Sequence, residues 1–498
     1  MERAYRADDV RAAEEPLLAA GEPLMDRAAY AVAQRAIRYL RESGQRIPGS
    51  TALALVGSGN NGGDALFAAA NLARRGLSCR AALLGTPHEA GLAAARAAGV
   101  GIIDVVGADV PEVELSKLAA WGGIWIDGIL GIGVRGAARE PIAGFLRLLD
   151  DERRASAAEP FVIAVDVPSG IGVDDGTLPG PALRAHATVA MGCAKPGLLL
   201  PPAARLAGEI DVVELGFSLG APAVLSLGDA DVADLWDVPG VDDHKYTRGV
   251  LGMHTGSGEY PGAAVLGVGA ALATGPGMVR YLGEAKDAVV GAHPETVTAP
   301  GRIQALVIGS GQTQVSDEAS HAFQEALAEG IPVVLDAGAI ELVHFDDVPS
   351  TVVITPHAGE LTLLLNTRGE KLSRAEVEAA PARAVRLAAA LTGATVVLKG
   401  ATDLVAAPDG PLFAQSGAPG WRATAGAGDV LAGVIGALLA GYGDEIAALG
   451  HGKGIPAMLA AGGCHLHARA ADLAADGGPI AAGDIVGALP ATIREVLK

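Results

Sequence analysis

Short runs rich in β-branched residues alternate with alanine-rich runs along most of the chain, and this alternation constrains the fold more than any other feature. Strands are expected at 51–57, 79–85, 123–131, 161–170, 250–256, 305–311, 332–338, 351–356, 394–400 and 403–410. Helical patterns separate most of them, and strand–helix–strand order is typical of parallel sheets covered by helices. The sequence therefore predicts an α/β fold with doubly wound sheets.

The alternation breaks at residues 216–243, which are acidic, punctuated by Gly and Pro, and weakly periodic. A chain of 498 residues has room for two to four domains. The strand spacing differs between the two halves, so they are unlike domains rather than repeats. We expect one domain at 1–220 and a second at 221–498, with two helices over 7–42 that are broken near Gly21.

The formal net charge is −20, which disfavours binding to nucleic acid polymers and to anionic membranes. Small anions can still bind, because backbone N–H groups at helix N-termini hold them without a net positive charge. The three cysteines are far apart and odd in number, which favours a reducing compartment. Residues 260–279 are uncharged but contain five glycines and two prolines, so no membrane span is predicted. We expect a cytoplasmic protein.

A glycine-rich loop, GSGNNGGD at 57–64, lies between an expected strand and an expected helix. Its glycine spacing fits the G-x-G-x-x-G pattern of dinucleotide-binding folds, although the next strand lacks the usual carboxylate. Asn61 or Asp64 could simply cap the helix. However, Asp127 and Asp166 also end strands and precede glycine-rich loops. Ligands bind at the carboxyl ends of parallel strands, so these loops predict a binding site.

The motifs GNNGGD, DGILGIGVRG, VDVPSG and HATVAMGCAKPG together resemble the YjeF N-terminal domain family, the NAD(P)HX epimerases, over residues 1–217. This resemblance implies a Rossmann-like fold that interconverts the R and S hydrates of nicotinamide cofactors. It implies that Asp166 is the acid/base residue and that Asn61, Asp127 and Ser169 bind K⁺. It implies substrate contacts by Asn60, Asn61, Gly62, Gly63, Asp64, Gly131, Ile132, Gly133, Val134, Arg135, Gly136 and Ala137.

In the second half, TAGAGDVLAG at 424–433 is a glycine-rich turn that opens a helix. Free N–H groups there can hold a transferring phosphoryl group. Asp429 at the helix start is the right type of residue for a general base. Alternatively, its carboxylate only stabilises the helix dipole. The small residues on both sides of Asp429 favour the catalytic interpretation.

The motifs VIGSG, PVVLDAGA, ITPHAGE, VVLKGATDLV and GWRATAGAGDVLAG resemble the ribokinase-like, ADP-dependent NAD(P)H-hydrate dehydratases, over about residues 224–498. The resemblance implies that ADP and Mg²⁺ are used and that AMP and phosphate are formed, with Asp429 as the base. It implies nucleotide contacts by Lys399, Gly400, Ala401, Thr402, Asp403 and Gly428. It implies contacts to the hydrated cofactor by Ala264, Gly311, His357 and Asp429.

Together these patterns predict a bifunctional repair enzyme acting on NAD(P)HX and ADP, and we expect a homo-oligomer. Two alternatives stay open: a small-molecule kinase with a Rossmann-like regulatory domain, and a non-catalytic nucleotide-binding protein.

Cys464, His465 and His467 are not expected to bind a metal, because these positions on one helix do not converge on a single ion. Trp421 lies beside the predicted nucleotide loop.

Overall fold

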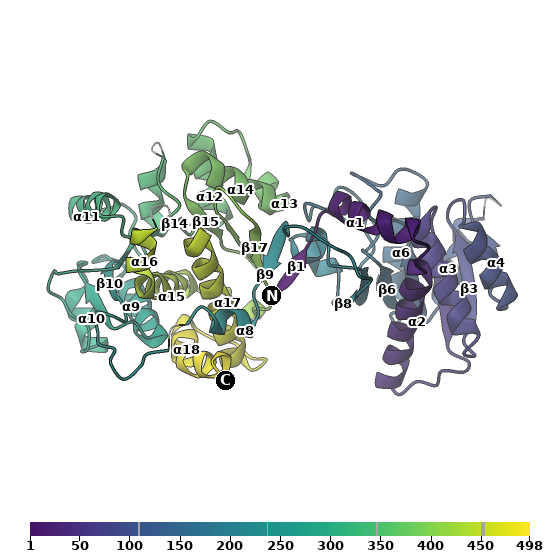
Figure 1. Ribbon diagram of the computed structural model, residues 1–498, viewed down its shortest axis with the longest axis horizontal. Helices are drawn as coiled ribbons and strands as arrows, with labels where there is room; N and C mark the ends of the chain where they lie inside the picture. The colour runs from purple at the N-terminus through teal and green to yellow at the C-terminus, as the bar shows by residue number, and fades with distance from the viewer. Residues whose placement is uncertain (108–109, 237, 345–346, 450–453) are drawn as a thin grey trace. The chain divides into compact units, whose positions relative to one another are not determined.

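The structure is a computed structural model that describes residues 1–107, 110–236, 238–344, 347–449 and 454–498. It divides into two compact units. The N-terminal unit comprises Arg3–Ala223, and the C-terminal unit comprises Val224–Lys498 together with Met1 and Glu2. Figure 1 shows an α/β fold in both units, with helices packed on the sheet, which confirms the predicted fold class.

The N-terminal unit contains a seven-stranded sheet in the order β4-β3-β2-β5-β6-β7-β8, and every described strand pair is parallel. The strands are β2 (Thr51–Val56), β3 (Ser78–Leu83), β4 (Gly101–Asp104), β5 (Ile124–Gly128), β6 (Phe161–Val165), β7 (Ala187–Met191) and β8 (Glu209–Val213). This order places the carboxyl ends of β2, β5 and β6 side by side, with Val56 opposite Gly128 and Asp127 opposite Ala164. The three predicted polar loops therefore leave the sheet at neighbouring positions.

Helices cover both faces of this sheet. They are α1 (Ala7–Ala19), α2 (Leu24–Glu42), α3 (Asn60–Ala73), α4 (Glu89–Ala97), α5 (Glu112–Trp121), α6 (Ile142–Ala155), α7 (Pro196–Leu199) and the 3₁₀ turn η1 (Ala203–Leu206). One core includes Leu40 of α2 and Leu66 of α3, and the other is built around Trp125 of β5. The break between α1 and α2 falls near Gly21, as predicted.

Within the C-terminal unit, the strands of the sheet follow the order β9-β17-β16-β15-β14-β13-β12-β10-β11. These strands are β9 (Val224–Ser226), β10 (Val250–His254), β11 (Met278–Tyr281), β12 (Ala305–Ile308), β13 (Val333–Leu335), β14 (Val352–Ile354), β15 (Thr395–Leu398), β16 (Asp403–Ala406) and β17 (Leu412–Gln415). A further short strand, β1 (Glu2–Ala4), lies near the N-terminus. The sheet is parallel from β11 to β15, but β15, β16 and β17 pair antiparallel. Only four residues separate β15 from β16, which is too short for a parallel crossover.

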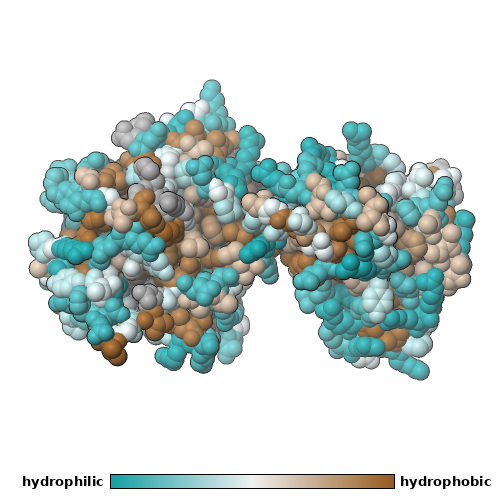
Figure 2. Space-filling model, in the orientation of Figure 1, coloured by the Kyte–Doolittle hydropathy of each residue, from teal (hydrophilic) through white to brown (hydrophobic). Residues whose placement is uncertain are grey.

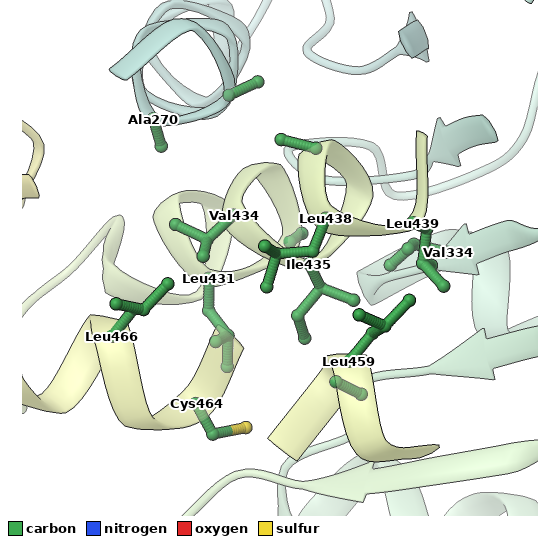
Figure 3. Packing of buried hydrophobic residues seen from close by; sticks show 14 of the residues in the cluster. Ala270, Val334, Leu431, Val434, Ile435, Leu438, Leu439, Leu459, Cys464 and Leu466 are labelled. Atoms are coloured by element: carbon green, nitrogen blue, oxygen red, sulfur yellow. The ribbon is translucent and has the colours of Figure 1, made fainter. Parts of the chain in front are cut away.

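The helices of this unit are α8 (Asp229–Ala233), α9 (Pro261–Thr274), α10 (Lys286–Ala292), α11 (Asp317–Ala328), α12 (Ala358–Thr367), α13 (Arg374–Ala379), α14 (Pro381–Thr392), α15 (Ala427–Gly441), α16 (Gly443–Ala448), α17 (Ile455–Ala475) and α18 (Ala482–Val496), with 3₁₀ segments η2 (Ala337–Val343) and η3 (Gly420–Arg422). Helix α15 is apolar on all sides, which is typical of a buried helix. Leu431, Ile435 and Leu439 of α15 pack in a core that also includes α9, α17 and the sheet (Figure 3). The helix that carries Asp429 is therefore held from several sides.

Every strand expected from the sequence is present, although most are two to four residues shorter than expected. Strands β1, β4, β7, β8, β9, β11 and β17 were not expected. They have three to five residues and show no clear alternation in the sequence. Figure 2 shows hydrophilic residues interspersed with hydrophobic patches on the visible face of both units. Among the described residues, no helix is both long and apolar enough to span a bilayer.

Candidate active sites

A cavity of about 620 Å³ lies at the carboxyl ends of β2, β5 and β6 in the N-terminal unit. The loops after β2 and β5, the end of β6 and helix α1 contribute to its walls. Eight of the predicted residues line it: Asn60, Asn61, Asp64, Gly131, Ile132, Gly133, Val134 and Asp166. Sequence positions more than 100 residues apart thus meet at the sheet edge where a site was expected.

Other predicted substrate contacts do not line this cavity. Gly62 and Gly63 are buried in the first turn of α3. A Cβ at Gly62 would fall 2.1 Å from the Gly57 carbonyl oxygen, so this glycine permits close approach of the loop to the helix. Arg135, Gly136 and Ala137 follow the lining segment, and Arg135 is exposed and pairs with Asp8.

Asp166 lies directly after β6 in the left-handed region, with φ 67°, which is rare for a residue with a side chain. Its Oδ1 accepts a hydrogen bond of 2.9 Å from the Met191 amide and forms an ion pair with the Lys195 ammonium. Lys195 is fully buried and also donates to the carbonyl oxygens of Met191 and Cys193. The backbone and the ion pair therefore fix one carboxylate oxygen of a strained residue at the cavity wall.

The three residues predicted to bind K⁺ meet around Leu130. Asn61 donates to the Leu130 carbonyl oxygen at 3.1 Å, and the Leu130 amide donates to Ser169 Oγ at 2.8 Å. Ser169 in turn donates to Asp127 through its hydroxyl at 2.6 Å and its amide at 2.8 Å. Burial raises the pKa of Asp127 to about 6, although the Ser169 hydrogen bonds oppose this rise. Carboxamide, carboxylate, hydroxyl and carbonyl oxygens are thus gathered in one place.

Two titratable residues that were not predicted also belong to this cavity, beside Asp64, which was. Glu14 of α1 and Lys195 both line it. Asp64 is 8% exposed, and its Oδ1 has no hydrogen-bond partner. Burial raises the pKa of Asp64 well above its usual range, and the charges of Asp166 and Glu14 add to this effect. Lys195 stands in the quoted AKPG motif and could have been found there, whereas no motif signals Glu14.

In the C-terminal unit, Asp429 occupies the first turn of α15, behind Gly426 with φ 90°. A side chain is strained in that conformation, so glycine is required where the loop turns into the helix. Burial raises the pKa of Asp429 to about 6, and the charge of Asp336 adds to the rise while Lys399 opposes it. The carboxylate therefore lies beside free helix N–H groups with a pKa near neutrality.

Lys399 extends from the loop after β15 and pairs with Asp336 at 2.8 Å. Asp336 also accepts hydrogen bonds from Thr355 Oγ1 at 2.7 Å and Ser310 Oγ at 2.9 Å. Burial alone would raise the pKa of Asp336, but the Lys399 ammonium and these hydroxyl groups together lower it. Asp336 is therefore an ionised anchor that fixes the lysine.

A cavity of about 530 Å³ opens beside the start of α15. Six predicted residues line it: His357, Lys399, Gly400, Ala401, Asp403 and Gly428. Thr402 and Asp429 are not part of its lining. Ala264 is fully buried on α9, and Gly311 follows β12, away from this cavity. Gly311 has φ 69°, and a Cβ there would fall 2.3 Å from the Ala263 side chain, so glycine permits close packing against α9.

Arg422 and His467 also line this second cavity, and neither was predicted to do so. Arg422 pairs with buried Asp403 at 2.5 Å and lies 3.5 Å from His467 Nδ1. Burial, together with the Arg422 charge, lowers the pKa of His467 to about 3, so the ring is neutral. His465 pairs instead with Asp229 at 2.6 Å. Within the described residues, no group of three His, Cys, Asp or Glu side chains is placed to hold a metal ion.

The comparisons with known proteins agree with this division. Residues 21–197 match the model of the YjeF-related protein N-terminus, and residues 251–485 match that of NAD(P)H-hydrate dehydratase. The bifunctional NAD(P)H-hydrate repair enzyme Nnr of Mycobacterium leprae is 40% identical over 497 residues, or 96% of each chain. The NAD(P)H-hydrate epimerase of Clavibacter sepedonicus is 42% identical over 222 residues, or 43% of this chain and 91% of its own.

Among solved structures, the ADP/ATP-dependent NAD(P)H-hydrate dehydratase of Bacillus subtilis aligns with 54% of this chain and 97% of its own, with a TM-score of 0.47 and 24% identity. The repair enzyme of Mycobacterium tuberculosis is 40% identical over 455 residues, or 88% of this chain and 89% of its own. Identity of this level over nearly the whole chain confirms the resemblance found in the motifs. With an epimerase domain followed by a dehydratase domain, the chain belongs to the family of bifunctional NAD(P)H-hydrate repair enzymes.

Proposed function

We propose that the N-terminal cavity binds the hydrated nicotinamide ring of NAD(P)HX and that Asp166 moves a proton at the hydrated ring carbon. The observation that carries this proposal is that one cavity brings the Asn60–Asp64 and Gly131–Val134 segments together with buried Asp166. The ion pair with Lys195 fixes the orientation of the Asp166 carboxylate, as a residue that transfers a proton requires. Arg135, Gly136 and Ala137 would contact the remainder of the dinucleotide beyond the cavity. Gly62 and Gly63 would contribute through their backbone.

We assign a K⁺ site to Asn61, Asp127 and Ser169. Hard cations prefer neutral and anionic oxygen ligands, and the network around Leu130 supplies both types. A bound K⁺ would supply a positive charge that orders the loops after β2 and β5. Replacing K⁺ by a bulky organic cation should slow epimerisation and lower the melting temperature of the N-terminal unit, while dehydration of the S hydrate is unchanged.

For the C-terminal unit, we propose that Lys399–Asp403 and Gly428 bind ADP and that Asp429 is the general base. Asp429 takes the proton of the ring hydroxyl, whose oxygen attacks the terminal phosphorus of ADP and displaces AMP. The ring nitrogen lone pair then expels phosphate, and loss of a proton from the adjacent carbon restores the double bond of NAD(P)H. The N–H groups at the start of α15 stabilise the charge on the transferring phosphoryl group.

We propose that Mg²⁺ arrives as a complex with the nucleotide. Mg²⁺ is commonly held by substrate phosphates and one or two carboxylates rather than by a dedicated protein cage. The carboxylates of Asp336 and Asp429 suit this arrangement, since Asp336 is near enough for its charge to raise the pKa of Asp429, and they form no three-ligand cluster among the described residues. The positive charge of Mg²⁺ would balance the negative charge of the nucleotide phosphates. His357, Gly311 and Ala264 are assigned to the hydrated cofactor, and backbone groups would make the contacts at the latter two.

The test is to incubate the full chain with S-NADHX, ADP and Mg²⁺ and to follow products by ³¹P NMR together with NADH absorbance. The proposal predicts equal amounts of NADH, AMP and phosphate. A stable phosphorylated organic product without NADH would instead support the small-molecule kinase. Asp429→Asn should bind ADP normally and lose at least about 10²-fold in rate, as expected when a general base is removed. Full turnover by that variant would refute the role of Asp429.

We also propose a cytoplasmic homo-oligomer. The three cysteines are free and buried, which suits a reducing compartment. The alanine-rich helices α1 and α2 offer a surface for a second chain. Sedimentation velocity of the purified chain should show a species of at least twice the monomer mass, and a monomer at micromolar concentration would refute the oligomer.

A further inference from the structure

Helix α1 contributes one face to the epimerase cavity. Val10, Arg11 and, about one turn further along the helix, Glu14 all line it. Arg11 fixes the helix there by donating to the Ile132 carbonyl oxygen at 2.5 Å, within the Gly131–Val134 segment. At the start of the helix, the Ala7 amide donates to Asp174 at 2.8 Å. Glu14 is therefore held against the binding loop by its own helix.

The Glu14 carboxyl group is half-buried, and within the described residues it makes no hydrogen bond or ion pair. It shares the cavity with Asp166 and with Asp64, whose buried Oδ1 also has no partner. Polar groups removed from water are normally paired, and leaving one unpaired destabilises the fold. The buried, unpartnered oxygen of Asp64, in a cavity that Glu14 also lines without a protein partner, therefore indicates that a ligand exchanges hydrogen bonds with these groups.

The charges around Glu14 favour its protonated form. Burial raises the pKa of Glu14, the carboxylate of Asp166 raises it further, and Lys195 and Arg11 oppose the rise. Asp166 differs because the Lys195 ammonium is paired with it directly. One cavity thus holds a carboxyl group whose pKa is raised and a second carboxyl group that is paired with a cation, and two carboxyl groups in different surroundings are what acid–base chemistry uses.

We propose that Glu14 is a second catalytic acid/base residue of the epimerase, acting with Asp166 from a different element of the cavity wall. The inference rests on the proposed function of this site. Inverting the hydrated carbon requires its hydroxyl group to leave from one face and water to add to the other. Two groups, one on α1 and one at the end of β6, meet that requirement where one residue would not. Glu14 also lies before residue 21, outside the segment that matches the family model.

The chemistry balances without an external reagent. Glu14 gives its proton to the ring hydroxyl, the C–O bond breaks, water leaves, and the ring nitrogen lone pair forms a C=N⁺ bond. A water molecule then adds to the opposite face, and Asp166 accepts one of its protons. In the reverse direction Asp166 is the acid and Glu14 the base. Proton exchange with solvent returns both carboxyl groups to their starting states.

The test measures conversion of purified R hydrate into S hydrate by chromatography, without ADP and above the rate without enzyme. Glu14→Gln in the full chain should lower kcat by about 10²-fold or more with little change in KM, as for loss of a general acid or base. The pH profile of kcat for Glu14→Gln should also lack the limb that the titration of Glu14 produces. Glu14→Asp, which keeps a carboxyl group, should restore part of the rate. Dehydration of S hydrate with ADP should be unchanged.

Glu15→Gln is the matched control, because Glu15 is the exposed neighbour on α1 and does not line the cavity. It should keep the native rate within about twofold. If Glu14→Gln retains the native kcat and pH profile while Asp166→Asn is inactive, Glu14 is not catalytic although the proposed function stands. If Asp166→Asn is fully active as well, the proposed function of the cavity itself is wrong.

Discussion

The titration of Asp429 makes a quantitative prediction for the dehydratase. With a pKa of about 6, this carboxyl group is about nine-tenths ionised at pH 7 and about one-tenth ionised at pH 5. Only the ionised form can remove the proton of the ring hydroxyl. At saturating S hydrate and ADP, kcat should therefore fall about ninefold to tenfold between pH 7 and pH 5, with the midpoint near pH 6.

The rate of NADH appearance, followed by absorbance at each pH, measures this acidic limb of the pH profile of kcat directly. The terminal phosphate of ADP also titrates near pH 6, so the limb must be assigned to one of the two groups. The residual rate of Asp429→Asn, measured at high enzyme concentration, separates them. If the limb belongs to Asp429, the variant's slow rate is independent of pH across this range.

A second variant tests the physical cause of the shift. Lys399 lowers the pKa of Asp429 against the effects of burial and of Asp336. Lys399→Met should therefore move the acidic limb above pH 6. The reasoning is refuted if the native limb lies near pH 4, if Asp429→Asn keeps the same limb, or if Lys399→Met moves the limb to lower pH.

Three further variants test the two sites separately. Lys195→Met leaves buried Asp166 without its cation and should lower the free energy of unfolding of the N-terminal unit by about 3–5 kcal/mol, with loss of epimerase activity. The urea unfolding transition should move to lower urea concentration, and an unchanged midpoint would contradict this prediction. Gly57→Ala places a Cβ 1.8 Å from the Ile129 carbonyl oxygen and should abolish epimerisation but not dehydration, whereas an alanine at Gly220, which has open space, should have no effect. Arg422→Met leaves buried Asp403 without its cation and should weaken ADP binding at least about tenfold in calorimetry; a native Kd would show that this ion pair does not shape the nucleotide site.

Much of the fold could be predicted from the chain because the strongest strands are continuous apolar runs followed by glycine-rich loops. β2 and β6 are of this kind, and Asn61 and Asp166, which follow their ends, line the cavity. Edge strands such as β4 and β8 were missed because they are short and only partly buried, so no apolar run signals them. The antiparallel pairing of β15 with β16 depends on a turn length and not on hydrophobic pattern.

The residues of the candidate sites likewise divide into those that the sequence predicts and those that it does not. Residues within glycine motifs could be found because the motif fixes the backbone that carries them. Glu14, Arg422 and His467 could not, because they reach their cavities from helices or turns whose docking depends on tertiary packing. The three neighbouring residues Cys464, His465 and His467 have different surroundings: Cys464 is in the core, His465 pairs with Asp229, and His467 lines the second cavity.

The central claim is that two separate sites on one chain together repair both hydrates. The most direct measurement is the final NADH absorbance after the full chain is incubated with a known mixture of R- and S-NADHX, excess ADP and Mg²⁺. We predict complete recovery by the native chain, recovery of only the S share on the same timescale by Asp166→Asn, and almost none by Asp429→Asn. Recovery of only the S share by the native chain, or complete recovery by Asp429→Asn, would contradict the account.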